Sequence, residues 1–168
     1  MNKLTTIVAA AHRPRRILVP ADDGREPAYR RAQHYAIELA DLSGAELLVA
    51  DRSKETWADT PHHIGPLTPA EYQQQGNHHL DELFAEASAR GIEVRVWVAS
   101  LPTPEGFEEA VTSNDVQLAV LPDRFDRPTW TERLFGTRMA QVARAVAPGV
   151  AVVSVPRGGF PDFLSPAA

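Results

Sequence analysis

Charged residues crowd a short loop in the C-terminal half of the chain, where they could bind phosphate groups or a metal ion. Residues 116–121 are an apolar run that stops at Pro122, because proline cannot continue a central strand. Beyond residue 135 apolar side chains recur at helical spacing, so this stretch is expected to form a strand, a loop and a helix. The charged residues of the loop are Asp123, Arg124, Asp126 and Arg127.

A second acidic position lies near the start of the chain. Asp22 directly follows the apolar run 17–21 and is followed by Asp23-Gly24, a turn signal. Asp22 could line a ligand crevice, because open α/β sheets bind ligands at the carboxyl ends of their strands. It could equally well be a turn residue leading into a helix N-terminus, where carboxylates are favourable. The residues alone leave both interpretations open.

The histidine pairs His62-His63 and His78-His79 do not predict a metal site. Adjacent histidines on a helix cannot both face one ion, and a His-Glu-x-x-His motif does not occur in the sequence. We expect these four histidines to lie on the solvated surface. The sequence also has no Gly-x-Ser-x-Gly, P-loop or Gly-x-Gly-x-x-Gly motif. We therefore expect no catalytic residues and no metal ligands, and the question of an enzyme stays open.

Strand-like and helix-like segments alternate along the chain. A helix is expected from Pro27 to Ser43, with Arg30 and Arg31 facing water, and another from Pro69 to about Arg90, weakened by Gly76. Such alternation predicts an α/β fold with a parallel sheet and helices on both faces, and the pattern does not decide between two possible strand orders. The five expected strands are residues 17–21, 47–50, 92–99, 116–121 and 150–155.

Composition limits the possible functions. The 168 residues suit one domain, with an N-terminal extension (1–14) and a C-terminal tail (157–168) flanking residues 15–156. A net charge of -5 argues against a nucleic-acid partner, and the absence of cysteine excludes disulfides and thiolate metal sites. No apolar run is long enough to span a membrane. Residues 1–11 are a poor secretory signal, so we expect a disordered or loosely docked extension and a cytoplasmic protein.

The order of these segments resembles the universal stress protein family from Arg16 to Pro156. The matching pieces are residues 17–22, 44–49 and 91–94, Leu134-Phe135-Gly136-Thr137, and residues 147–153. The resemblance implies an open five-stranded parallel sheet with strand order 3-2-1-4-5. It also implies a nucleotide crevice, for which the expected residues are Asp22, Val49, Asp123, Arg124, Asp126, Arg127, Gly136 and Thr137.

The loop departs from the family pattern at two glycine positions. Many members bind ATP through Gly, two residues, Gly, nine residues, and then Gly with Ser or Thr. Counting back from Gly136-Thr137 places Asp123 and Asp126 at the first two glycines. Glycines allow backbone N–H groups to approach a phosphate, whereas an aspartate adds a Cβ and a like charge. Two like charges at about 4 Å repel by about 4 kcal/mol at an intermediate dielectric, which is roughly a thousandfold in affinity.

The last strand, Val150 to Val155, is expected at the far edge of the sheet. An apolar edge must be paired or covered. The resemblance implies a homodimer through this edge; the alternative is coverage by the tail, with Phe160 and Phe163 packing over it.

Three functions follow. The first is a non-enzymatic, homodimeric stress-response or regulatory module that lacks family-style ATP binding, has no cofactor and could bind a partner protein. The second is an adenine-nucleotide (ATP) binding protein with a variant phosphate loop. The third is a small-molecule hydrolase using the same crevice, with residues 52–67 as its lid.

Overall fold

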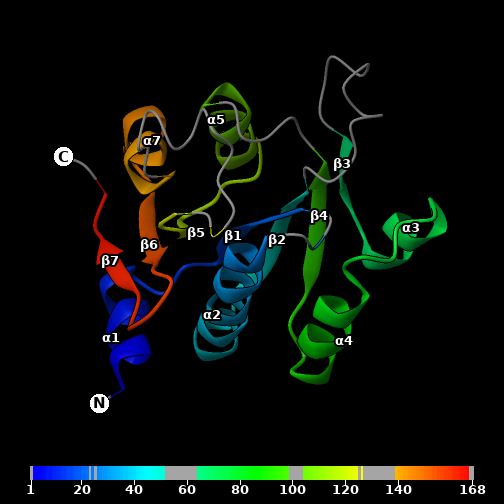
Figure 1. The fold of residues 1–168 in the computed structure, drawn as a ribbon, viewed down its shortest axis with the longest axis horizontal. Helices are drawn as coiled ribbons and strands as arrows, with labels where there is room; N and C mark the ends of the chain where they lie inside the picture. The colour runs from blue at the N-terminus through cyan, green and yellow to red at the C-terminus, as the bar shows by residue number, and fades with distance from the viewer. Residues whose placement is uncertain are drawn as a thin grey trace.

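The computed structural model describes residues 2–22, 24, 26–51, 64–98, 104–124, 126 and 139–166. Its seven-stranded sheet has the order β3-β4-β2-β1-β5-β6-β7 (Figure 1). The strands are β1 Arg16–Ala21, β2 Glu46–Asp51, β3 Ile64–Leu67, β4 Val94–Val98, β5 Leu118–Pro122, β6 Ala151–Val155 and β7 Asp162–Leu164. The helices are α1 Lys3–Ala10, α2 Pro27–Ser43, α3 Pro69–Gln74, α4 Asp81–Ala89, α5 Pro104–Ser113 and α7 Met139–Val146.

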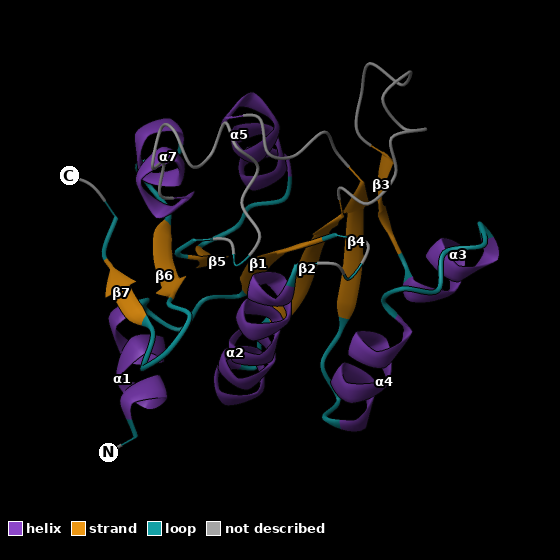
Figure 2. Cartoon of the chain, viewed as in Figure 1, coloured by secondary structure: helices purple, strands orange, loops and turns teal. Residues whose placement is uncertain are grey.

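The five central strands β4, β2, β1, β5 and β6 are parallel and follow the predicted order. Their residues are almost continuously apolar because both faces of the sheet are covered by helices. Helices α1, α2 and α4 lie on one side, and α5 and α7 on the other (Figure 2). Two core clusters result, one packed around Ile17, Val19 and Val49, the other around Leu18, Trp97 and Phe107.

The prediction of five strands was wrong, because an antiparallel strand is added at each edge of the sheet. β3 pairs with β4 and comes from the end of the connection expected over residues 52–67. Gly65 suits this position, since a Cβ there would lie 2.6 Å from the carbonyl oxygen of Val96. The added strands use the hydrogen-bonding groups that the edges of a parallel sheet leave open.

β6 is an interior strand of the sheet rather than its far edge. The tail folds back as β7, with Val152 opposite Leu164 and Val153 opposite Phe163. Phe160 packs against the core and meets Tyr35 with ring centroids 6.2 Å apart. Coverage by the tail, the alternative weighed above, is therefore what the chain adopts at this edge.

The N-terminal extension contains a docked helix, contrary to the expectation of a disordered or loosely docked segment. Asn2 caps α1 by accepting a hydrogen bond from the backbone N–H of Leu4 at 3.2 Å. Leu4, Ile7 and Val8 are buried in the core cluster that α2 also lines. Burial of each of these side chains contributes about 1.5–3 kcal/mol to the free energy of docking, before the loss of chain entropy is counted. This is why the segment docks.

The helix expected from Pro69 to Arg90 is two helices, α3 and α4. Gly76 has a positive φ of 82°, a left-handed conformation that ends α3. Asn77 is buried and donates a hydrogen bond from its side chain to the carbonyl oxygen of Tyr72 at 3.3 Å. The break turns the chain between α3 and α4 and brings His79 beside the end of β2.

Candidate functional site

Two of the residues predicted to line a nucleotide crevice follow β1 and β5, which end side by side. The two strands are parallel neighbours, with Ile17 opposite Leu118. The chain leaving β1 enters α2 on one face of the sheet, and the next described helix after β5 is α7 on the other face. Such a divergence is the point at which open α/β sheets bind ligands. Asp22 directly follows β1, and Asp123 directly follows β5.

Asp22 shapes the turn into α2. Its Oδ1 accepts a hydrogen bond from the backbone N–H of Gly24 at 2.8 Å, and its Oδ2 accepts one from Glu26 at 3.1 Å. This is the pattern of an aspartate that closes a turn on its own backbone. The contacts match the turn interpretation of Asp22, and they engage both carboxylate oxygens.

Glu26 joins the start of α2 to the loop after β5, a role that the sequence analysis did not predict. Its side chain is the N-cap of α2, accepting from the backbone N–H of Ala28 at 3.1 Å. The same oxygen, Oε1, accepts from the backbone N–H of Asp126 at 2.7 Å, across 100 residues of sequence. Glu26 is only 8% exposed, so its carboxylate is held by these donors rather than by water.

Arg31 neutralises the carboxylate of Asp126, contrary to the expectation that Arg31 faces water. Its two terminal nitrogens donate to the two oxygens of Asp126 at 2.8 and 2.7 Å, a bidentate ion pair. The side chains are 27% and 14% exposed. The hydrogen bonds to Asp126 raise the pKa of Arg31, burial opposes this, and the charges of Asp126 and Glu26 raise the pKa further. Arg157 lies 4.0 Å from the same carboxylate.

We call Asp22, Glu26, Arg31 and Asp126 the loop cluster. Beside it, the backbone N–H of Asp123 donates to the carbonyl oxygen of Val155 at 2.8 Å, extending the pairing of β5 with β6. Both loop positions that correspond to family glycines therefore have their backbone N–H groups bonded within the chain.

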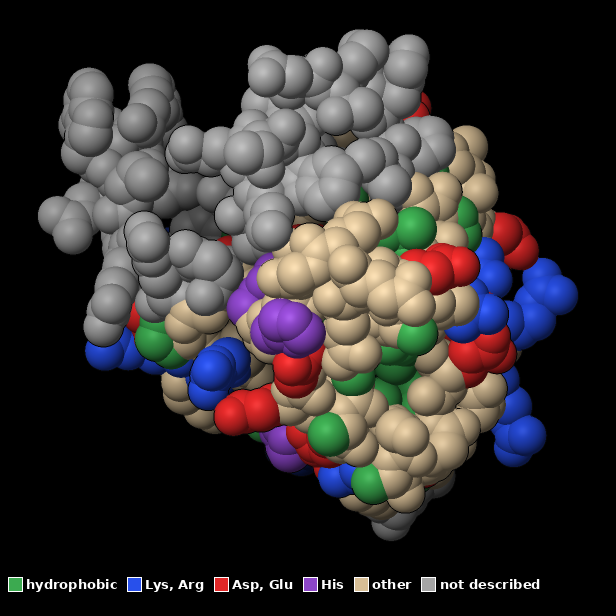
Figure 3. Space-filling view, turned by 90° about the vertical axis from the view of Figure 1, so that its right-hand side faces the viewer, with side chains coloured by type: hydrophobic (Ala, Val, Ile, Leu, Met, Phe, Trp, Pro, Cys, Tyr) green, Lys and Arg blue, Asp and Glu red, His purple; other side chains and the backbone are tan. Residues whose placement is uncertain are grey.

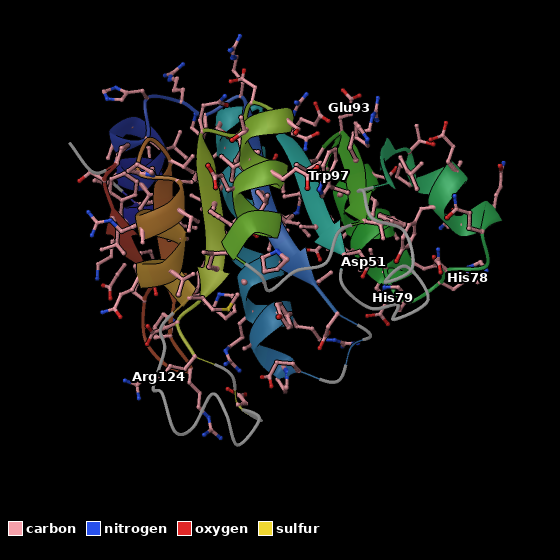
Figure 4. The ribbon with its side chains drawn as sticks, turned by 90° about the horizontal axis from the view of Figure 1, so that it is seen from above. Asp51, His78, His79, Glu93, Trp97 and Arg124 are labelled. Atoms are coloured by element: carbon pink, nitrogen blue, oxygen red, sulfur yellow. The ribbon has the colours of Figure 1, made fainter. Side chains whose placement is uncertain are left out.

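The other predicted crevice residues are placed differently or fall outside the description. Val49, a residue of β2, is fully buried in a core cluster. Arg124 is exposed and lies away from Asp51 and His79 (Figure 4). Arg127, Gly136 and Thr137 lie outside the described residues, so their part in the site stays a prediction.

A second polar cluster, which we call the histidine cluster, consists of Asp51, Tyr72 and His79. Asp51 is the last residue of β2 and is fully buried, as is Tyr72 from α3. The Tyr72 hydroxyl donates to Asp51 Oδ2, and His79 Nε2 lies 2.9 Å from that hydroxyl and 3.4 Å from Asp51 Oδ1. Asp51 and His79 lie close together in Figure 4.

With Asp51 ionised, the contacts assign a hydrogen to Nε2 of His79. The hydroxyl of Tyr72 has one proton, which it donates to Asp51, so it can only accept from His79. Nε2 is therefore protonated and faces the buried carboxylate. The surface prediction holds for His78, whose side chain is 66% exposed beside Asp81, but was wrong for His79, which is 19% exposed.

On the face that carries α3 and α4, histidine side chains lie beside acidic ones (Figure 3). Within the described ranges, no three or more potential ligands from His, Asp and Glu come together as a metal site. In the same part of the chain, no helix is both long and apolar enough to cross a membrane.

Sequence signals existed for some of the missed residues. Glu26 precedes Pro27 at the start of a helix, a position where a capping side chain is expected. Asp51 ends an apolar strand, as Asp22 does. Nothing local pointed to Arg31 or His79, because their partners lie 95 and 28 residues away.

Comparison with known proteins decides the family. The model of the universal stress protein family matches residues 14–154. The chain belongs to the universal stress protein family. No curated protein sequence matches it.

Solved structures share the fold of this family member at low sequence identity. A universal stress protein in complex with cAMP is 20% identical, with 84% of this chain and 96% of that chain covered and a TM-score of 0.53. The protein MJ0577 is 12% identical, with coverages of 87% and 98% and a TM-score of 0.58. A universal stress protein from Archaeoglobus fulgidus is 15% identical, with coverages of 84% and 91% and a TM-score of 0.51.

Proposed function

We propose that this chain is a non-enzymatic regulatory member of the universal stress protein family that acts in stress response without binding ATP in the family's manner. The observation that carries this proposal is that the backbone N–H groups of the loop already donate hydrogen bonds within the chain. The backbone N–H of Asp123 bonds to Val155, and that of Asp126 bonds to Glu26. A phosphate nest needs such N–H groups turned toward the anion.

Charge supports the same conclusion. The carboxylate of Glu26 accepts from the Asp126 N–H, a donor that a phosphate nest in this loop would need, and Arg31 already pairs with the carboxylate of Asp126. A phosphate that used Arg31 would have to break a bidentate ion pair and approach a mostly buried carboxylate. Arg157 and Arg124 do not restore the balance, because exposed guanidinium groups are screened by water and salt.

The test is a denaturing extraction of freshly purified protein, with the released small molecules identified by mass spectrometry. We expect no stoichiometric nucleotide, and no thermal shift when ATP and Mg²⁺ are added. Stoichiometric ATP, ADP or AMP, or a saturable shift, would overturn the proposal. Phosphate release from ATP at a rate above that of buffer would overturn its non-enzymatic part.

A companion variant tests the role of the loop. Replacing Asp123 and Asp126 together by Gly removes both negative charges and both Cβ atoms. We expect this variant to gain ATP affinity; Asp115→Gly, an exposed aspartate with a positive φ of 51°, is the matched control for the substitution itself. If the folded double variant gains no ATP affinity, repulsion by the two aspartates does not explain the absence of ATP binding.

The second candidate function is nucleotide binding through a variant loop. It is supported by the fold relative whose structure contains cAMP, and by the arginines Arg31 and Arg157 near Asp126. The extraction should therefore be followed by a thermal-shift series with cAMP as well as ATP. A shift with cAMP alone would favour this second function over the first.

We also propose that the chain forms a homodimer. Because β6 is already paired with β7, a second copy would pair beside β7 or displace it, rather than meet a bare Val150–Val155 edge. Light scattering after size exclusion should give twice the chain mass of 18.4 kDa. The mass of one chain at micromolar concentration would contradict the dimer.

A further inference from the structure

In the loop cluster, carboxylates of the chain accept hydrogen bonds from donors that could also bind a phosphate-type oxyanion. The guanidinium of Arg31 and the backbone N–H of Asp126 are both oxyanion donors, and each is occupied by a carboxylate of the chain: Asp126 and Glu26 respectively. Glu26 also acts on Arg31, since its charge raises the pKa of that guanidinium. The three side chains therefore share one small electrostatic environment.

The pairing is too specific to be an ordinary surface contact. Both guanidinium bonds are 2.8 Å or shorter, and the Asp126 carboxylate is 14% exposed. The bond from the Asp126 N–H to Glu26 is 2.7 Å, and Glu26 is 8% exposed. A fork of two N–H donors facing two oxygens matches carboxylate and phosphate geometry alike.

We propose that Glu26 and Asp126 form a built-in ligand, occupying an oxyanion site made by Arg31 and the Asp126 backbone N–H. A phosphate-type oxyanion takes this site when the carboxylate of Asp126 is removed. This inference rests on the proposed function, since it explains why the loop of this family member excludes phosphate. It assigns ligand specificity to Glu26 and Arg31, which are the N-cap and a first-half residue of α2, and to Asp126 in the loop after β5.

The test measures binding of inorganic pyrophosphate by calorimetry at low ionic strength. Wild type should bind pyrophosphate only weakly, at the upper limit of dissociation constant that the measurement reaches. Asp126→Ala keeps the backbone N–H but frees Arg31, and should bind pyrophosphate at least about tenfold more tightly. Adding Arg31→Ala to that variant should abolish the gain.

Asp123→Ala is the matched control, because it removes the same charge from the same loop and leaves the Arg31–Asp126 pair in place. We expect Asp123→Ala to gain much less pyrophosphate affinity than Asp126→Ala. Equal gains in the two variants would mean that only net charge matters, and would overturn the proposal. A folded Asp126→Ala protein without any gain would overturn it as well.

Glu26→Gln decides the matter if Asp126→Ala does not fold. Glutamine still offers an oxygen to the N–H groups of Ala28 and Asp126 but removes one negative charge beside Arg31. We expect a gain in pyrophosphate affinity of about threefold; unchanged affinity would overturn the proposal. Nucleotide extracted from wild type would instead overturn the proposed function, so the two failures are distinguishable.

Discussion

The loop cluster lies at the carboxyl ends of β1 and β5, and the histidine cluster lies at the carboxyl end of β2. The two clusters hold their carboxylates by different means. Asp126 is partly exposed and neutralised by the guanidinium of Arg31. Asp51 is fully buried and held by the Tyr72 hydroxyl and by His79. One cluster joins loops that are far apart in sequence, whereas the other fastens the α3–α4 junction to the end of β2.

The degree of burial separates the contributions of the two clusters to stability and to ligand binding. A buried carboxylate that loses its hydrogen-bond partners, or a hydroxyl that loses its acceptor, cannot turn to water. When one partner of a partly exposed ion pair is removed, water can solvate the remaining charge, so less stability is lost. We therefore assign a mainly structural role to the histidine cluster and ligand discrimination to the loop cluster.

The largest expected effect is that of Asp51→Ala. The change leaves the fully buried Tyr72 hydroxyl without the oxygen to which it donates. We expect the free energy of unfolding to fall by about 3 kcal/mol, and Asp51→Asn to lose less because the amide oxygen still accepts. Urea unfolding measures both. A loss below about 1 kcal/mol for Asp51→Ala would contradict the assignment of a structural role.

A smaller effect is expected at Arg31. Removing its guanidinium in Arg31→Ala should lower the free energy of unfolding by about 1.5 kcal/mol, since the pair with Asp126 is bidentate but partly exposed. A double-mutant cycle with Asp126→Ala isolates the pair. A coupling energy near zero would show that the contact orders the loop without stabilising the fold.

The adjacent histidines offer a sharper internal comparison. His79→Ala removes a donor to Tyr72 and Asp51 and should lower the free energy of unfolding by about 1 kcal/mol. His78→Ala, a substitution at an exposed side chain beside Asp81, should leave the urea midpoint unchanged. Equal midpoints for the two variants would place His79 on the surface after all.

The smallest effect is expected at Arg15, which pairs with Asp115 across 100 residues of sequence. The pair has the same chemistry as Arg31–Asp126 but side chains that are 83% and 78% exposed. Arg15→Ala should therefore give no measurable change in thermal or urea midpoint. A loss as large as that of Arg31→Ala would show that burial does not separate the two pairs.

Local sequence patterns predicted the five parallel strands and the helices between them. Apolar runs such as 17–21 and 116–121 marked the strands, and Pro27 and Gly44 marked the ends of α2. These signals are local, since hydrophobic period and capping depend on neighbours within a few residues. The family resemblance then supplied the strand order, which periodicity had left open.

The three-dimensional packing of the chain brought together side chains that no local pattern connects. It paired Arg31 with Asp126, joined Glu26 to the loop after β5, and turned His79 toward Asp51. It also added β3 and β7 at the sheet edges and docked α1 through Ile7. Such contacts depend on where distant segments pack and on which charges burial forces into pairs, and no local pattern encodes that.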